Sequence, residues 1–192
     1  MTPRPPSKQP IPPHARKVFS GILFDVYQWE QELFDGTKTT FEKLVRPDTV
    51  VVYPVLPDGR IVLTRQEQPG KAPFLGAAGG RVDAGEDPLE AAHRELREET
   101  GYTAKHMKLI DARHWTSKID WVVYSFVATG ITEGGERNLD AGEKIDLMPV
   151  TFDEFLEIGC REKFLEKELM PKLYEARLDK EKYEELKKLF SN

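Results

Sequence analysis

Three glutamates in the middle of the chain have a spacing suited to binding a metal ion. Glu95, Glu98 and Glu99 fall at positions i, i+3 and i+4, so they share one face of a helix that turns by about 100° per residue. Like charges at this spacing destabilise a plain helix. A hard divalent cation relieves that repulsion and accepts oxygen ligands, which makes Mg²⁺ or Mn²⁺ the natural occupant. A solvated acidic helix face is the alternative interpretation.

The residues around these glutamates follow a fixed pattern. Gly80 is followed by five residues and Glu86, and then by seven residues and the run RELREETGY, which ends at Tyr102. This segment resembles the Nudix box, Gly-x5-Glu-x7-Arg-Glu-U-x-Glu-Glu-x-Gly-U, in which U is a bulky apolar residue. Every charged and glycine position matches, and only Tyr102 is atypical.

The resemblance implies a metal-dependent enzyme that hydrolyses a nucleoside diphosphate linked to another group. It implies that Glu95 and Glu99 are metal ligands and that Glu98 is a ligand or activates water. The carbonyl of Gly79, just before the box, is implied as a further ligand. In this chemistry metal ions bridge pyrophosphate oxygens, neutralise their charge and help to deprotonate the attacking water.

Other box residues are implied to support this site. Arg94 would act in catalysis by orienting the carboxylates through charge-assisted hydrogen bonds. Glu86 would support the geometry between loop and helix. Gly80 and Gly101 are the structural glycines of the motif, and Gly101 also supplies a C-terminal stop for the helix.

The residues before the glutamates predict where their helix begins. Asp87 suits the N-cap, Pro88 suits the first helical position, and Glu90 completes a capping box. The segment from Asp87 to Thr100 is therefore expected to be helical. An apolar stripe is expected to bury one side of the helix against a sheet, and it consists of Leu89, Ala92 and Leu96.

Strands are predicted on both sides of this helix, and further helices follow. The expected strands are 18–33, 39–44, 49–56, 61–65, 108–114, 121–129 and 144–148, with hairpin turns at Asp35-Gly36 and Asp58-Gly59. A second capping box at Thr151 opens a helix to about Gly159, and charged amphipathic segments follow. The order predicts an α+β Nudix fold, with a mixed β-sheet sandwiched between helices and an N-terminal β extension.

Length and composition predict the domain organisation. The chain has 192 residues, a net charge of −5 and 39% hydrophobic residues, which suits one globular domain and argues against nucleic acid as a partner. Residues 1–14 hold six of the 14 prolines and are expected to form a disordered tail. Residues 15–192 are expected to form a single Nudix domain, with N-terminal strands in 17–46, the box in 80–102 and C-terminal helices in 152–190.

Composition also bears on the compartment. The lone cysteine, Cys160, excludes an internal disulfide framework. No apolar run reaches the roughly 18 residues that a membrane span needs, and the first residues lack the apolar core of a secretory signal. We therefore expect a cytoplasmic protein without a membrane partner.

Outside the box, residues 17–160 resemble the ADP-ribose pyrophosphatase-like branch of the Nudix family. The branch has extra N-terminal strands that help to form a homodimer and reach the adenosine end of the substrate. Phe41, Glu42 and Arg46 fall where this branch has an aromatic, an acidic and a basic residue near the substrate. Glu143 falls at a recurrent loop glutamate that is implicated as a general base.

Two departures from the branch leave the substrate open. The run Gly76–Gly80 reads GAAGG, where the branch has Glu-x-Pro-Ala-Gly. Gln68 replaces an arginine that contacts phosphate, and Arg65 is expected to supply that charge instead. The resemblance favours ADP-ribose or another nucleotide sugar. A nucleoside triphosphate or dinucleoside polyphosphate hydrolase is the alternative, followed by a nucleotide sensor without turnover.

Overall fold

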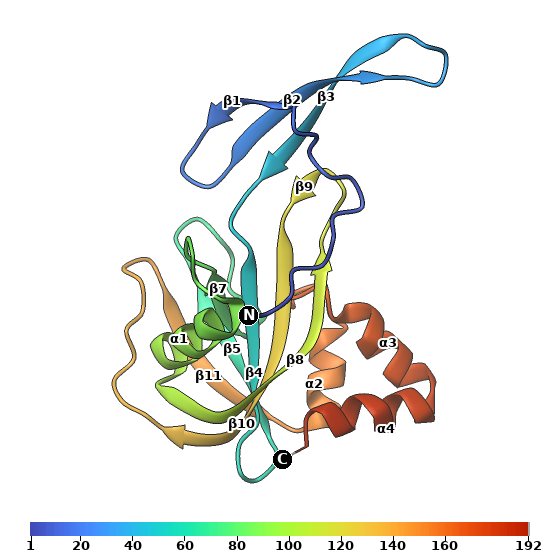
Figure 1. The fold of residues 1–192 in the computed structure, drawn as a ribbon. Helices are drawn as coiled ribbons and strands as arrows, with labels where there is room; N and C mark the ends of the chain where they lie inside the picture. The colour runs from blue at the N-terminus through green and yellow to red at the C-terminus, as the bar shows by residue number, and fades with distance from the viewer. Residues whose placement is uncertain (192) are drawn as a thin grey trace.

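The computed structural model of the protein describes residues 1–191, and Figure 1 shows the course of the chain. The strands are β1 Arg16–Ser20, β2 Asp25–Glu32, β3 Lys38–Val45, β4 Thr49–Pro54, β5 Ile61–Glu67, β6 Phe74–Gly76, β7 Ala78–Arg81, β8 Tyr102–His114, β9 Ile119–Asp120, β10 Val122–Glu133 and β11 Lys144–Val150. The helices are α1 Pro88–Thr100, α2 Phe152–Gly159, α3 Met170–Leu178 and α4 Lys180–Leu189. No helix in the described part of the chain is long and apolar enough to cross a lipid bilayer.

The central sheet is mixed. Its strands run in the order β7-β4-β10-β8. β4 and β10 are parallel, from the pair Thr49 and Val123 to the pair Pro54 and Ala128, whereas β8 and β7 pair antiparallel with their neighbours. A second, antiparallel sheet has the order β11-β5-β6. The predicted mixed sheet of an α+β fold is confirmed.

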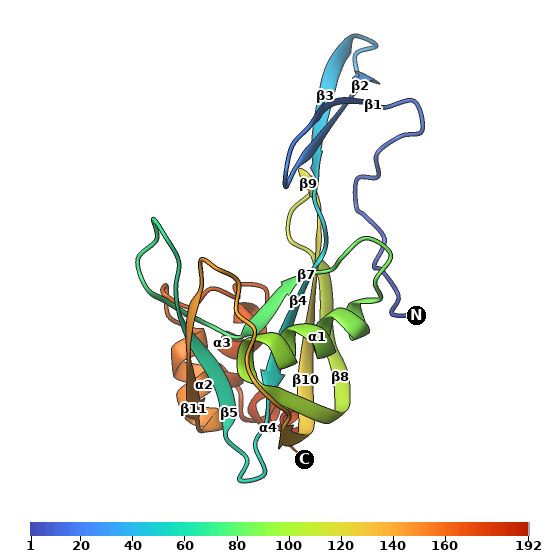
Figure 2. The same cartoon turned by 90° about the vertical axis from the view of Figure 1, so that its left-hand side faces the viewer.

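Strand β4 separates two hydrophobic cores. Successive side chains of a strand point to opposite faces. Val50 and Val52 therefore pack with Leu96 of α1, while Val51 and Tyr53 belong to the core on the other face. That second core also contains many side chains from the C-terminal part of the chain, including Phe155, Phe164, Leu173 and Leu186. Helix α1 thus covers one face and α2 to α4 cover the other, as Figures 1 and 2 show.

Helix α1 begins and ends where its sequence predicts. The Asp87 carboxylate accepts from the backbone N–H of Leu89, and Glu90 completes the capping box. Gly101 ends the helix in the left-handed conformation, with φ of 73°. The prediction is wrong for one residue of the apolar stripe, because Leu89 is 39% exposed. Ala91 takes its place in the core, beside Ala92 and Leu96.

Two strand predictions also need correction. The segment 18–33 is not one strand, because a turn closed by the Gly21 N–H and the Phe24 carbonyl at 2.8 Å separates β1 from β2. The strands on either side of Asp58-Gly59 do not form an extended hairpin. They share one bridge, between Val55 and Ile61, and then diverge into different sheets because each strand finds its main partners elsewhere.

The N-terminal β extension stands away from the central sheet. β1, β2 and β3 are antiparallel neighbours, and the short β9 pairs in parallel with β3 at Leu44 and Val45. Figures 1 and 2 show this sheet projecting beyond the rest of the domain. Several apolar side chains on it are exposed, namely Val18, Phe19, Ile22 and Phe34. The extension therefore offers an apolar surface that the domain itself does not cover.

The segment before β1 differs from the disordered tail expected of residues 1–14. It has no helix or strand, as its prolines dictate, yet polar contacts fasten it to the domain. Thr2 donates from its backbone N–H and its hydroxyl to the Asp87 carboxylate, each at 2.7 Å. The Arg4 guanidinium donates to Asp48 at 2.8 Å and to Asp120 at 2.8 Å.

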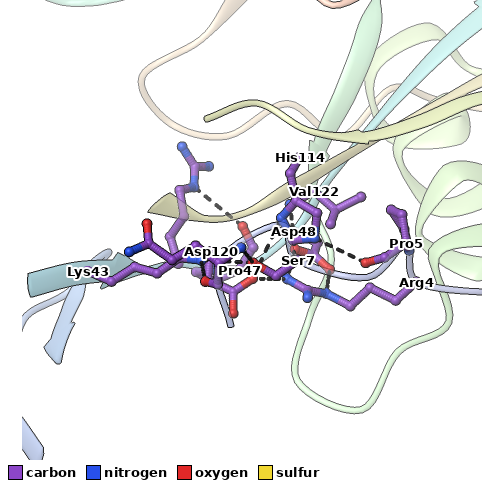
Figure 3. A network of polar contacts seen from close by, with 11 residues as sticks. Arg4, Pro5, Ser7, Lys43, Pro47, Asp48, His114, Asp120 and Val122 are labelled. Carbon is purple, nitrogen blue, oxygen red and sulfur yellow. Dashed lines mark hydrogen bonds and ion pairs between the residues drawn. The ribbon is translucent and has the colours of Figure 1, made fainter. Parts of the chain in front are cut away.

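Further contacts of this segment reach the extension, as Figure 3 shows. The Pro5 carbonyl lies 3.0 Å from Nε2 of His114. Ser7 and the carbonyl of Gln9 accept from the ammonium of Lys43, at 2.9 and 2.5 Å. Burial lowers the pKa of Lys43, and these oxygens replace water around its charge. The segment thus connects α1, the base of β4 and the β extension.

The Asp87 cap gives a first prediction. Asp87→Ala is expected to lower the free energy of unfolding by about 1 kcal/mol, the usual cost of losing an N-cap. It also removes the two acceptors of Thr2. Urea unfolding followed by circular dichroism measures the change. Asp83→Ala, in the exposed loop before the helix, is the control, and an equal loss in that variant contradicts the assignment.

Candidate active site

A cavity of about 360 Å³ opens where β4, α1 and the C-terminal segment meet. Its wall contains charged, aromatic and glycine residues from distant parts of the chain. The lining side chains and backbone belong to Arg46, Thr49, Val50, Val51, Gln66, Gln68, Lys71, Ala77, Gly79, Glu99, Trp115, Trp121, Val123, Glu143, Leu165, Glu166 and Glu168. Four residues predicted from the sequence are among them: Arg46, Gly79, Glu99 and Glu143.

Glu99 is the most buried of the predicted box carboxylates. It is 5% exposed, and one of its oxygens accepts from the backbone N–H of Gly79 at 3.0 Å. Burial raises its pKa to about 8, and the negative charges of Glu95, Glu143 and Glu166 act in the same direction. A carboxylate in such surroundings gains free energy when a cation neutralises it.

Arg94 holds the other box carboxylates together. Its guanidinium forms a two-pronged ion pair with Glu86, at 3.0 and 2.9 Å, and donates to the Arg81 carbonyl at 2.9 Å. Its remaining nitrogen donates to Glu95 at 2.7 Å and to Glu98 at 3.2 Å. This fork lowers the pKa of Glu86, while burial raises that of Glu95. One arginine thus fixes three carboxylates.

Two consecutive glycines, Gly79 and Gly80, allow strand β7 to approach these carboxylates. A Cβ atom on Gly80 would overlap the carboxylate of Glu95. A Cβ atom on Gly79 would overlap the backbone carbonyl of Val50. A side chain at either position would push β7 away from β4 or away from the glutamates. The backbone of the GAAGG run therefore forms the cavity wall directly.

The donor set fits a hard divalent cation by its chemistry. Glu95, Glu98, Glu99 and the Gly79 carbonyl supply only oxygen, which Mg²⁺ and Mn²⁺ prefer. Burial and like charge raise the pKa of Glu99 because they disfavour its negative charge. A bound cation would stabilise that charge. Within residues 1–191 no group of three His, Cys, Asp or Glu side chains stands in a ready-made metal geometry. Glu95 and Glu98 are instead paired with Arg94.

Part of the cavity wall is aromatic. Trp115 and Trp121 pack with ring centroids 6.4 Å apart, and Trp121 donates from its indole to Thr49 at 2.9 Å. The Arg46 guanidinium lies 4.3 Å from the Trp121 ring centroid. Such a stacked arginine and tryptophan form a flat surface for a planar group.

Three predicted substrate contacts lie outside this cavity. Arg65 is exposed on β5, between the buried Thr64 and Gln66, because strand alternation turns it to the other face. Phe41 packs against Trp29 on the extension, with centroids 6.0 Å apart. Glu42 accepts from Gln28 at 2.7 Å. The substrate roles of these three residues stay predictions.

Sequence reasoning missed two acidic residues of the cavity. Glu166 and Glu168 lie between α2 and α3 and are each 6% exposed. Burial raises the pKa of Glu166 to about 8 and that of Glu168 to about 7. A backbone bridge between Leu75 and Phe164 brings their segment to β6. No local motif marks them, since the bridge joins residues far apart in sequence.

The buried carboxylates give a prediction for the metal-free protein. Folding raises the pKa of Glu99 from 4.5 to about 8, so the folded state keeps a proton that the unfolded state releases in this interval. The free energy of unfolding should therefore fall as the pH rises from about 5 to about 8. Glu99→Gln should make this fall shallower in urea titrations with EDTA. An equally steep fall in the variant contradicts the assignment.

Comparisons with known proteins agree with this site. The profile of the NUDIX domain matches residues 45–173. ADP-ribose pyrophosphatase of Bacillus subtilis (strain 168) is 33% identical over 145 residues, which are 74% of this chain and 78% of that protein. The methanol dehydrogenase activator of Bacillus methanolicus is 31% identical over 146 residues, which are 74% of this chain and 79% of that protein.

Two hydrolases of ADP compounds are also similar. ADP compounds hydrolase NudE of Escherichia coli (strain K12) is 30% identical over 132 residues, which are 64% of this chain and 70% of that protein. A crystal structure of an ADP compounds hydrolase superposes with a TM-score of 0.71 at 22% identity, covering 91% of this chain and 95% of that one. The superposition shows the shared fold. Together with the box and its geometry, these matches show that the chain belongs to the Nudix hydrolase family.

Proposed function

We propose that this chain hydrolyses the pyrophosphate bond of a nucleoside diphosphate derivative of the ADP-ribose type, with Mg²⁺ or Mn²⁺ as cofactor. The observation that supports this most directly is the buried Glu99, which lines the same cavity as Glu143 and the aromatic pair. The name of the Bacillus subtilis relative points to ADP-ribose. Cleavage between the two phosphorus atoms of ADP-ribose yields AMP and ribose 5-phosphate.

The box residues would hold the metal. Nudix hydrolases use a divalent metal ion, and here Glu95, Glu99 and the Gly79 carbonyl would be its ligands, with Glu98 as a ligand or water-activating group. The bound metal neutralises charge on the diphosphate and favours deprotonation of water. Arg94 keeps the carboxylates oriented through its ion pairs. If Glu95 and Glu98 were to ligate the metal, Arg94 would still keep its two bonds to Glu86.

The loop before β11 would complete the reaction site. Glu143 lines the same cavity as Glu99, and it lies in a turn in which its N–H bonds the Asp140 carbonyl at 2.9 Å. A carboxylate there can accept the proton of the attacking water. Arg46 and Trp121 would receive the adenine ring, because their stacked faces match a planar base. The diphosphate would then lie between the aromatic pair and Glu99.

An assay with a panel of nucleotides tests this function. Wild-type protein with Mg²⁺ or Mn²⁺ should convert ADP-ribose to AMP and ribose 5-phosphate, as identified by chromatography. Glu98→Gln and Glu99→Gln should each lower kcat by about 100-fold or more, the scale expected for losing an acid–base or metal-binding group. Glu133→Gln, an exposed glutamate at the end of β10, is the matched control.

Each outcome of this assay has a clear meaning. No turnover of any nucleotide sugar by the wild type contradicts the proposed substrate class, and products from ATP or a dinucleoside polyphosphate alone would assign one of those substrates instead. Normal kcat in Glu99→Gln contradicts the assigned metal site. Tight nucleotide binding without hydrolysis, measured by calorimetry, would indicate a sensor.

We further propose that the chain forms a homodimer through the N-terminal extension. Phe19 is 58% exposed and Ile22 fully exposed, and burying such side chains between two chains would remove apolar surface from water. Light scattering should give twice the monomer mass of 22.0 kDa. The double substitution of Phe19→Ser and Ile22→Ser should shift the equilibrium towards the monomer. A monomeric wild type contradicts this arrangement.

A further inference from the structure

Glu166 and Glu168 each carry a buried carboxylate oxygen without a hydrogen-bond partner among the residues that the structure describes, and both residues belong to the cavity wall. Oε2 of Glu166 and Oε1 of Glu168 are buried and have no hydrogen-bond partner within the described chain. Both residues line the cavity of Glu99. A buried polar atom left unpaired costs free energy, so such atoms in a folded protein call for an explanation. Two in one cavity wall indicate a ligand that donates hydrogen bonds.

The backbone fixes the position of these carboxylates. The Leu165 N–H donates to the Leu75 carbonyl at 2.8 Å, and the Leu75 N–H donates to the Lys163 carbonyl at 3.2 Å. The same segment packs on Gly76, where a Cβ atom would lie 2.9 Å from Oε1 of Glu166. The backbone N–H of Ala77 also interacts with the Glu166 carboxylate. Glu166 is thus anchored beside β6, while its Oε2 has no hydrogen-bond partner in residues 1–191.

The groups around Glu166 and Glu168 limit the kinds of ligand that can bind there. Glu166 lies near enough to Glu99 for their charges to interact, so its ligand group lies beside the proposed diphosphate. A phosphate group at that position carries mainly acceptor oxygens at neutral pH and has no hydrogen to donate to the two unpaired oxygens. A neutral group with hydroxyls would instead donate to both free oxygens. Within residues 1–191 no third metal-ligating side chain joins these two to form a cation site.

We propose that Glu166 and Glu168 determine substrate specificity by accepting hydrogen bonds from the hydroxyls of the sugar attached to the diphosphate and by excluding a terminal phosphate. This inference rests on the proposed function and deepens it. The cavity then has an aromatic end for the base, a box-facing wall for the diphosphate and a carboxylate wall for the sugar. Selection between a sugar nucleotide and a nucleoside triphosphate then follows from whether the group at the sugar position can donate hydrogen bonds.

The test compares ADP-ribose with ATP. The Glu166→Gln and Glu168→Gln double variant keeps shape but removes charge and one acceptor at each residue. It should lower kcat/KM for ADP-ribose by about 10-fold or more, the scale of one hydrogen bond to a charged group, mainly through a higher KM. kcat/KM for ATP should stay equal or rise. Calorimetric Kd values for ADP-ribose and ATP with EDTA present should show the same loss of preference.

Two further variants separate specificity from folding. Gly76→Ala should displace the Glu166 carboxylate without changing its charge, and it should lower the same ratio of kcat/KM values. Glu162→Gln, an exposed glutamate of the same segment, should leave the ratio unchanged. Thermal unfolding of every variant shows that it is folded at the assay temperature.

The outcomes distinguish this inference from the proposed function. An unchanged preference for ADP-ribose in both the double variant and Gly76→Ala overturns the inference while the proposed function stands. A shift in the Mg²⁺ concentration needed for half activity, with the preference unchanged, also overturns it and assigns the carboxylates to the metal. A wild type that binds ADP-ribose through Glu166 and Glu168 but hydrolyses nothing supports the inference and contradicts the function.

Discussion

The crowding of carboxylates around one cavity is the constraint on which the rest of the site depends. Glu99, Glu143, Glu166 and Glu168 all line it, and burial removes the water that would screen their repulsion. The fold meets this cost in several ways. Arg94 forms ion pairs with the box carboxylates, and the Gly79 N–H donates a hydrogen bond to Glu99. The raised pKa of Glu99 favours its protonation, which removes part of the remaining repulsion. The repulsion that remains favours the proposed binding of a cation at this site.

Strand β4 joins the cavity to both hydrophobic cores of the fold. Its alternating side chains enter both cores, and Thr49, Val50 and Val51 also line the cavity. β4 lies between β7, which carries the glycines, and β10. Packing on either face therefore sets the distance between α1 and the GAAGG backbone. Part of the cavity wall is therefore sheet backbone, which strand pairing on both sides of β4 holds in place.

The local parts of this arrangement could be predicted from the sequence. The limits of α1 follow from Asp87, Pro88 and Gly101 because capping acts over a few residues. The box also predicted that Arg94 orients carboxylates of the motif. Pairing between distant segments could not be predicted, because no local pattern encodes it. The bridge from Leu75 to Phe164 brought Glu166 to the cavity, and contacts with Asp48 and Lys43 fastened a proline-rich segment that composition alone assigns to disorder.

The same N-terminal segment affects how the protein can be handled and fused. Thr2 bonds the residue that caps the catalytic helix, so anything joined ahead of it emerges beside the start of α1. An affinity tag or fusion partner placed there would compete with the Thr2 and Arg4 contacts and would act on the box and the β extension together. The opposite terminus follows α4, on the other face of the central sheet (Figure 1). Attachment at that end keeps the foreign chain apart from the catalytic helix.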